Sequence, residues 1–220
     1  MNDDVNHLFN EGVTHSLEAH EHEERDSGEQ AADSDRKAVA AFDQVLDLDS
    51  QHLGALSGKG LALARLGKTQ EAAGVFRKAI EIDPDYAENH RQLGLCFVEL
   101  GDIALARQAT FRALELETRA EFRRAAAVEI YNIAGGIMMS AAQHRDAGRF
   151  DDESQCYIQA KTVFSLTLDV DGSLQPAAKA LRIVDSCMGV DAKEGLPERG
   201  QEDKKHSGPR GFWGRLFGRK

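Results

Sequence analysis

Three histidines stand among acidic residues near the N-terminus, and these residue types together hold transition metals. His15, His20 and His22 alternate with glutamates over residues 15–24. Imidazole and carboxylate groups can share a metal ion. The spacing is not that of a closed zinc site, and no cysteine joins the group. We therefore interpret this stretch as a solvated charged run and expect neither a metal site nor a cofactor.

Nucleophilic and catalytic groups are also sparse. The three cysteines, Cys96, Cys156 and Cys187, are far apart and odd in number. That favours reduced thiols in a cytoplasmic protein over a disulfide framework. Cys96 falls inside an apolar helical pattern, which is typical of a small core residue. The sequence has no glycine-rich phosphate loop, nucleophile elbow or pair of catalytic acids. We expect a protein that is not an enzyme.

The last residues, 210–220, combine aromatic and basic side chains. A helical wheel places large apolar side chains on one arc and arginines on the other: Phe212, Trp213, Leu216 and Phe217 against Arg215 and Arg219. This pattern is typical of a helix that lies at a membrane surface. The run also resembles the C-terminal membrane-targeting tails of bacterial division-site Min-system ATPases. Two alternatives stay open: a peptide that docks on a partner protein or on the chain's own groove, and a tail without a role.

Charge is distributed unevenly along the chain. The net charge is −10, yet residues 204–220 carry basic side chains and no acid, so the rest is more acidic than the total suggests. An acidic body argues against nucleic acid as a partner, because phosphate binding needs a basic face. The N-terminus has no apolar signal segment, and no apolar run approaches the length of a membrane span. We expect a protein or peptide partner and a cytoplasmic location, with the tail allowing attachment to an anionic membrane surface at the inner face of the membrane.

The middle of the chain repeats at a spacing of 34 residues. Residues 53–86 and 87–120 align with small residues in register: Gly60 with Gly94, Gly67 with Gly101, Ala72 with Ala106 and Ala79 with Ala113. A fixed period of this length is typical of a helix–turn–helix solenoid. Small residues let paired helices cross closely, and a glycine after the first helix of each pair satisfies its last carbonyls.

This pattern resembles the tetratricopeptide repeat family. The match is strong over residues 36–118 and weaker over 5–18 and 120–172. It departs from the pattern at four positions: Lys59 stands in the usual place of leucine, His90 in that of the large residue, Thr110 in that of phenylalanine and Thr118 in that of proline. The resemblance implies an all-α right-handed superhelix of about three to four helix pairs, with a concave groove lined by the first helices and a capping helix at 174–188.

The resemblance also implies that a peptide lies in this groove. The groove positions of the two clear repeats are Ser57, Leu61 and Ala64, then Glu88, Arg91, Leu95 and Val98. The alternative for these residues is packing between repeats and contact with solvent. Gly58 and Gln92 stand where chaperone-binding members carry carboxylate-clamp residues, so that ligand class is not supported. We expect a non-enzymatic adaptor or scaffold held at a membrane surface by its tail. The alternative is a soluble chaperone-like or assembly scaffold whose tail docks on a protein.

The expected organisation has four parts. Residues 1–35 form a degenerate first repeat helix with an acidic insertion, in which 19–35 is a solvated loop or a frayed helix extension. Residues 36–188 form the repeat domain, with Gly148 ending one long helix and a second covering about 150–168. Gly135 and Gly136 are expected to permit a close helix crossing. Residues 189–209 are expected to be a flexible linker, and 210–220 are the basic amphipathic tail.

Overall fold

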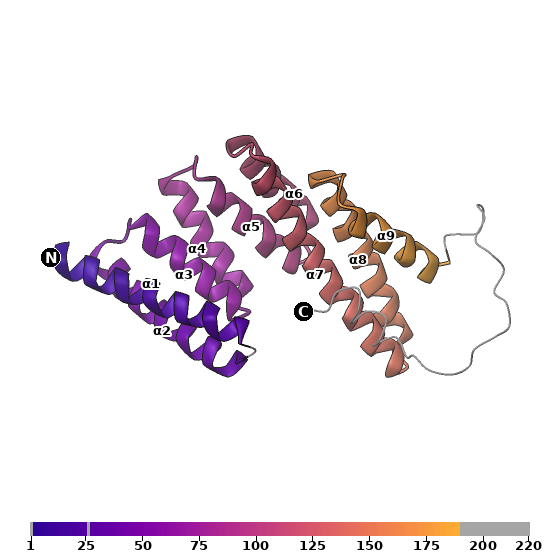
Figure 1. The fold of residues 1–220 in the computed structure, drawn as a ribbon, viewed down its shortest axis with the longest axis horizontal. Helices are drawn as coiled ribbons and strands as arrows, with labels where there is room; N and C mark the ends of the chain where they lie inside the picture. Colours follow the sequence, from indigo (N-terminus) through magenta and orange to yellow (C-terminus); the bar gives the residue numbers. More distant parts are fainter. Residues whose placement is uncertain (1, 26, 190–220) are drawn as a thin grey trace. The chain divides into compact units, whose positions relative to one another are not determined.

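The computed structural model describes residues 2–25 and 27–189, which form helices joined by short turns (Figure 1). Nine α-helices occur within these residues: α1 (Asn2–Glu24), α2 (Gly28–Leu48), α3 (Leu53–Arg65), α4 (Thr69–Ile82), α5 (Ala87–Glu99), α6 (Ile103–Leu116), α7 (Ala120–Asp146), α8 (Phe150–Val170) and α9 (Gln175–Cys187). The expected all-α helical-repeat class is confirmed. Most of the predicted linker and the whole predicted tail, residues 190–220, lie outside the described residues.

The chain divides into two compact units, residues 1–118 and 119–220. In the first unit, α1 packs on α2, α3 on α4 and α5 on α6, and each pair also contacts the next. α3 and α5, the first helices of the two clear repeats, touch directly. The three pairs therefore form a continuous stack, which is how repeats bury the apolar faces that a single pair would expose.

Close crossing at glycine holds each pair together. A Cβ atom built on Gly60 would lie 2.7 Å from the ring of Phe76, and one on Gly12 would lie 2.6 Å from the ring of Phe42. Both rings are buried, with 0% and 1% of their surface exposed. α1 and α2 therefore cross at a glycine against an aromatic ring, as α3 and α4 do. In the third pair, the same glycine position meets the shorter Thr110.

The first helix of each clear repeat ends at a glycine, as the sequence predicts. Gly67 has φ of +72° and Gly101 has φ of +78°, a backbone conformation that side chains with a Cβ rarely adopt. After Gly67, the amide of Lys68 donates to the carbonyl of Leu63 at 2.9 Å. This bond satisfies a carbonyl that would otherwise be left open at the end of α3.

The acidic stretch is helical over residues 19–24 and 28–35, so the loop alternative is wrong there and the alternative of a helix extension holds. Residues 19–24 continue α1, and α2 already begins at Gly28. Ser34 and Asp35 are buried in this extension, at 5% and 2% exposure. Arg65 of α3 donates to both carboxylate oxygens of Asp35, at 2.5–3.1 Å. The extended helices are therefore tied to the next repeat by an ion pair that apolar patterning does not reveal.

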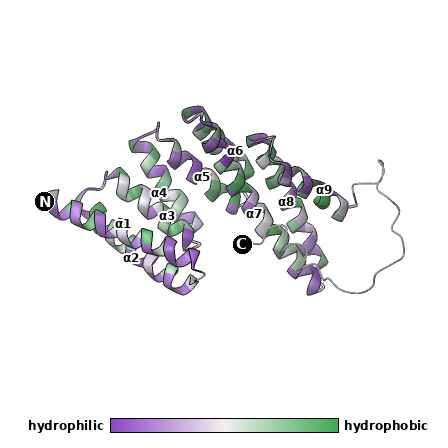
Figure 2. Cartoon of the chain, viewed as in Figure 1, coloured by the Kyte–Doolittle hydropathy of each residue, from purple (hydrophilic) through white to green (hydrophobic). Residues whose placement is uncertain are grey.

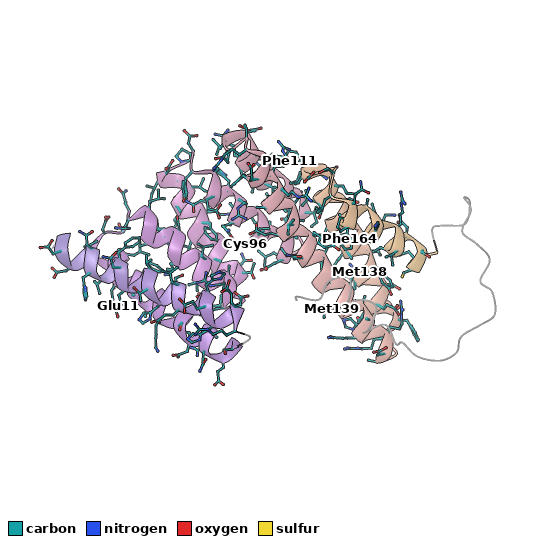
Figure 3. All side chains as sticks on the ribbon, in the orientation of Figure 1. Glu11, Cys96, Phe111, Met138, Met139 and Phe164 are labelled. Atoms are coloured by element: carbon teal, nitrogen blue, oxygen red, sulfur yellow. The ribbon has the colours of Figure 1, made fainter. Side chains whose placement is uncertain are left out.

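The second unit is built on a long hairpin of α7 and α8, with α9 packed on α8. The rings of Tyr131 and Phe164 meet with centroids 5.6 Å apart. Figure 3 labels Met138, which is fully buried, and its neighbour Met139, which is 47% exposed. Gly136 is exposed with no neighbour within 4 Å of a built Cβ, so it makes no close crossing, whereas Gly135 is buried.

Helix α7 is long and apolar enough to cross a membrane by length and composition alone. The criterion of an uninterrupted apolar run missed it, because polar residues are spaced along it. Half of the apolar window is buried within the protein. Figure 2 shows hydrophobic and hydrophilic residues alternating around this helix. Because the core helix of a soluble domain passes the same test, we interpret α7 as the core helix of the hairpin.

Candidate functional site

Two neighbouring first helices carry the predicted groove residues. Ser57, Leu61 and Ala64 lie on α3, and Glu88, Arg91 and Leu95 lie on α5; all six are partly exposed. Leu61 and Leu95 occupy the same position in their repeats, 34 residues apart. The two helices contact each other, so these leucines belong to one face of the first unit.

Val98 does not belong to that surface. It is 2% exposed, so its expected exposure is wrong. Residues four apart lie on the same side of a helix, and Val98 lies one turn beyond Gly94, whose built Cβ would approach Thr110 of α6. The side chain is therefore turned towards the helix pair interior and contributes to the core.

The charged residues of the groove are paired with each other. Arg91 donates to both carboxylate oxygens of Glu88, at 2.5 and 2.9 Å, and Gln92 donates to the same group at 2.8 Å. Burial alone would raise the pKa of Glu88, but the hydrogen bonds from Arg91 and Gln92 outweigh it and lower the pKa below its usual value. Glu88 therefore stays ionised in the groove, next to a guanidinium whose side chain is 13% exposed.

A buried amide links the two first helices, and the sequence did not point to it. Asn89 has no exposed surface, and its Oδ1 accepts a hydrogen bond from the hydroxyl of Ser57 at 2.9 Å. Its Nδ2 has no hydrogen-bond partner within the part of the chain that the structure describes. Ser57 thus joins adjacent repeats, which is the packing role left open for the groove positions. The signal that could have found Asn89 is a polar residue inside an otherwise buried helical stripe.

Lys59, which stands where the repeat pattern usually has leucine, also has a structural explanation. The Lys59 side chain is 22% exposed, and its ammonium forms an ion pair with Asp43 of α2. A lysine stem can cover apolar surface while its charge reaches water or an acid. The usual leucine is therefore replaced without leaving an unpaired charge in the repeat.

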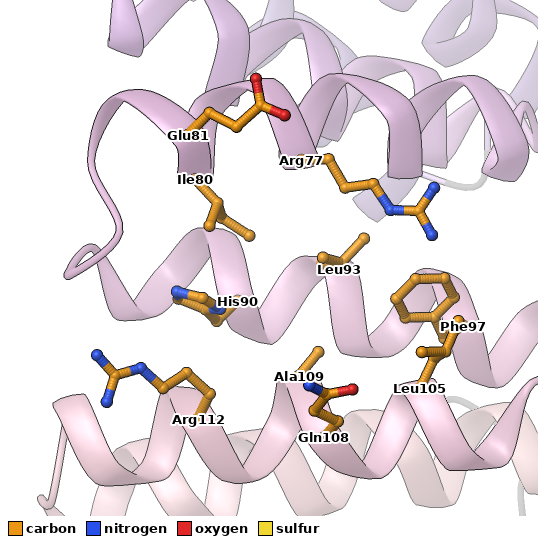
Figure 4. A pocket seen from close by; sticks show the side chains of 10 residues that line it. All are labelled: Arg77, Ile80, Glu81, His90, Leu93, Phe97, Leu105, Gln108, Ala109 and Arg112. Carbon is orange, nitrogen blue, oxygen red and sulfur yellow. The ribbon is translucent and has the colours of Figure 1, made fainter.

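A pocket of about 400 Å³ opens between α4, α5 and α6, and sequence reasoning missed it. Figure 4 shows apolar side chains in its centre and cationic groups towards both ends. Its lining residues are Arg77, Ile80, Glu81, His90, Leu93, Phe97, Leu105, Gln108, Ala109 and Arg112. The pocket depends on the distance between α4 and α6, the second helices of the two clear repeats. The repeat pattern does not specify this distance.

The histidine run forms local pairs. His15 Nδ1 lies 2.9 Å from Glu18, and His20 Nε2 lies 3.6 Å from Glu24. Over residues 2–25 and 27–189, no three His, Cys, Asp or Glu side chains are arranged to hold a metal ion. Burial, helped by the charge of Glu99, raises the pKa of the Cys96 thiol to about 12, so this cysteine is no nucleophile near neutral pH.

Comparison with known proteins identifies the repeats. Two family models, each described as tetratricopeptide repeat, match residues 36–87 and residues 63–128. Residues 36–128 of the chain are tetratricopeptide repeats. The matched region runs from the second half of α2 to the start of α7, and it includes both helices that carry the groove residues.

One curated protein and one solved structure are similar to this chain. A TPR repeat-containing thioredoxin, TTL4, of Arabidopsis thaliana is 27% identical over 93 residues, which is 42% of this chain and 14% of that protein. The present chain thus covers only a small part of the length of this relative. Among solved structures, the MamA protein is similar with a TM-score of 0.46 and 16% identity, covering 90% of this chain and all of that one.

Proposed function

We propose that this protein is a non-catalytic adaptor that binds a peptide segment of a partner protein along α3 and α5. The observation that supports the proposal is the pair of partly exposed leucines, Leu61 and Leu95, at equivalent positions of adjacent first helices. Helical-repeat proteins use such extended surfaces for binding. The Glu88–Arg91 pair at the edge of the same face offers polar anchors for a peptide backbone or side chain.

Leu61 and Leu95, the apolar strip of the groove, would supply the binding affinity when a peptide covers them. Burying a leucine side chain contributes roughly 1.5–3 kcal/mol, and each 1.4 kcal/mol changes a dissociation constant about tenfold. Replacing both leucines by glutamate removes this burial and adds two charges to the strip. Both positions are only partly buried, so the substitutions spare the core residues Leu63 and Phe97.

Affinity purification of the full chain from its native cells, with quantitative mass spectrometry, tests the proposal. We expect the double variant Leu61→Glu/Leu95→Glu to recover a partner at least tenfold less than the unchanged protein does. The matched control is Lys78→Glu, an exposed charge reversal on α4 outside the groove. Circular dichroism must show the same helicity for all three chains. Equal recovery of every partner would contradict the groove assignment.

The tail carries the second part of the proposal. Residues 210–220 attach the adaptor reversibly to an anionic membrane surface at the inner face of the membrane, in the cytoplasm. Support comes from the sequence: a helical wheel would place Phe212, Trp213, Leu216 and Phe217 on one arc and Arg215 and Arg219 outside it. Basic residues near anionic lipid contribute about 1 kcal/mol each. Attachment of this kind would concentrate the adaptor near its partners.

Co-sedimentation with anionic vesicles, compared with neutral vesicles, tests the tail. We expect the unchanged protein to pellet with anionic vesicles and the variant Trp213→Glu/Phe217→Glu to stay in solution. Equal pelleting of both chains would exclude membrane attachment through these residues. Tail-dependent binding to a protein without any dependence on lipid would favour the alternative, a soluble assembly scaffold.

A further inference from the structure

The pocket between α4, α5 and α6 lies on the far side of α5 from the groove. A helix turns by about 100° per residue. His90, Leu93 and Phe97 line the pocket, and they form one stripe along α5. Glu88, Arg91 and Leu95 form another, roughly opposite. The pocket and the groove are therefore separate surfaces of the same repeats, and a ligand in one does not occupy the other.

We propose that this pocket is a second docking site, which binds an acidic peptide segment by a large apolar side chain flanked by carboxylates. The floor of the pocket is apolar. Ile80, Leu93 and Leu105 come from three different helices and line the pocket, with Leu93 between the other two (Figure 4). Leu105 is 36% exposed, so water reaches apolar surface there. A volume of about 400 Å³ is within the range of ligand pockets.

The charges at the two ends select the ligand. At one end, the guanidinium of Arg77 stacks over the ring of Phe97, 5.1 Å from its centroid. Arg77 has no ion pair with an acid of the described residues. Its five donors therefore remain open to a carboxylate, and the ring fixes their position. An arginine left unpaired on a chain of net charge −10 is an exception to the acidic surface.

Arg112 lies at the other end, beside His90 (Figure 4). It contacts Asp85 and Glu115, both at 3.2 Å, but these acids are 77% and 68% exposed. Exposed pairs of this kind contribute little stability, so an incoming carboxylate can replace them at small cost. Among the described residues that line the pocket, the only acid is Glu81. An apolar centre with a guanidinium at either end complements an apolar side chain between two acids.

The same charges argue against the chain's own tail as the occupant. Residues 210–220 carry aromatic side chains that would suit the floor, but they bring arginines and lysine and no acid. Like charges at close range are unfavourable, more so where water is displaced. An external acidic segment therefore fits the pocket better than the tail does.

A display selection tests the proposal on the full chain. The bait carries Leu61→Glu/Leu95→Glu, so the groove is blocked and failure of the groove assignment does not affect the result. The probe is a phage library of random twelve-residue peptides. We expect enriched peptides to combine a large apolar residue with flanking aspartate or glutamate. A synthetic copy of an enriched peptide should bind at least tenfold more weakly when its acids are replaced by lysine.

Variants of the bait locate the bound peptide. We expect Arg77→Glu to weaken binding at least tenfold and Leu105→Glu to do the same, whereas the neighbouring reversal Lys78→Glu should change it less than twofold. All three positions are at least partly exposed, so the fold is retained. Enrichment of peptides without acids, no enrichment at all, or equal binding by Arg77→Glu and Lys78→Glu would overturn the proposal. Competition by a peptide of residues 210–220 would overturn the choice of occupant.

Discussion

At the scale of single residues, the most consequential contact is the ion pair between Arg65 and Asp35. The carboxylate is 3% exposed and receives hydrogen bonds from two guanidinium nitrogens. The arginine also donates to Ser16 of α1 at 2.8 Å, so one side chain joins three helices. Removing the arginine leaves a buried charge without a partner, which is far more costly than losing an exposed pair.

We expect Arg65→Leu to lower the free energy of unfolding of the first unit by about 2–3 kcal/mol at pH 7. The arginine side chain is itself 28% exposed, which reduces the loss from the value for a fully buried pair. Arg25→Leu is the matched control, because its partner Glu21 is solvent-exposed, and should stay within about 0.5 kcal/mol. Urea unfolding followed by circular dichroism measures both. Similar losses for the two variants would contradict the assigned role.

Glu88 makes the groove sensitive to acid. Its pKa in the folded protein is lowered from 4.5, since the hydrogen bonds from Arg91 and Gln92 outweigh the effect of burial. A group with a depressed folded pKa stabilises the fold above its unfolded pKa, and this contribution is lost as the pH falls through the folded pKa. We expect the loss of stability between pH 7 and pH 3 to be smaller in Glu88→Gln than in the unchanged protein. Urea midpoints at both pH values measure it, and an equal or larger loss would refute the linkage.

At the scale of helices, the crossings of paired helices were predictable where a small residue meets a large one. Gly60 and Phe76 occupy positions that the 34-residue period repeats, so their crossing follows from the sequence. The sequence left open whether the acidic stretch between α1 and α2 is a loop or a helix extension, because apolar spacing does not reveal the long-range contact from Arg65 to Asp35. The pocket did not follow from the sequence. The period fixes which side chains share a helix face but not the distance between two second helices.

Two glycines of one repeat should respond oppositely to alanine. In Gly60→Ala the new methyl group would lie 2.7 Å from the buried ring of Phe76, so we expect a loss of about 1–3 kcal/mol in unfolding free energy. Gly74 lies inside α4 with no atom within 4 Å of a built Cβ. There alanine should stabilise the protein by about 0.5–1 kcal/mol, its advantage over glycine in a helix. Thermal unfolding separates the two, and a change of the same sign in both would disprove the crossing as described.

At the scale of the whole molecule, three stacked helix pairs make one unit and a long hairpin with α9 makes the other. The first unit carries two binding surfaces on opposite sides of α5, one proposed for a peptide along the first helices and one for an acidic segment between the second helices. The class of fold could be predicted from the sequence, whereas the position of the groove stays a prediction. The second surface and the buried Ser57–Asn89 link required the structure, since both depend on how neighbouring pairs are rotated.

The central claim is that a partner protein lies on the face formed by α3 and α5. The most direct measurement is photocrosslinking in native cells, with p-benzoylphenylalanine placed at Leu95 in the full chain and at Lys78 as the control outside the groove. We expect a discrete crosslinked partner from Leu95 and none from Lys78. We also expect the Leu95 product to disappear when Leu61→Glu is added. No product from Leu95, or the same product from both positions, would contradict this claim.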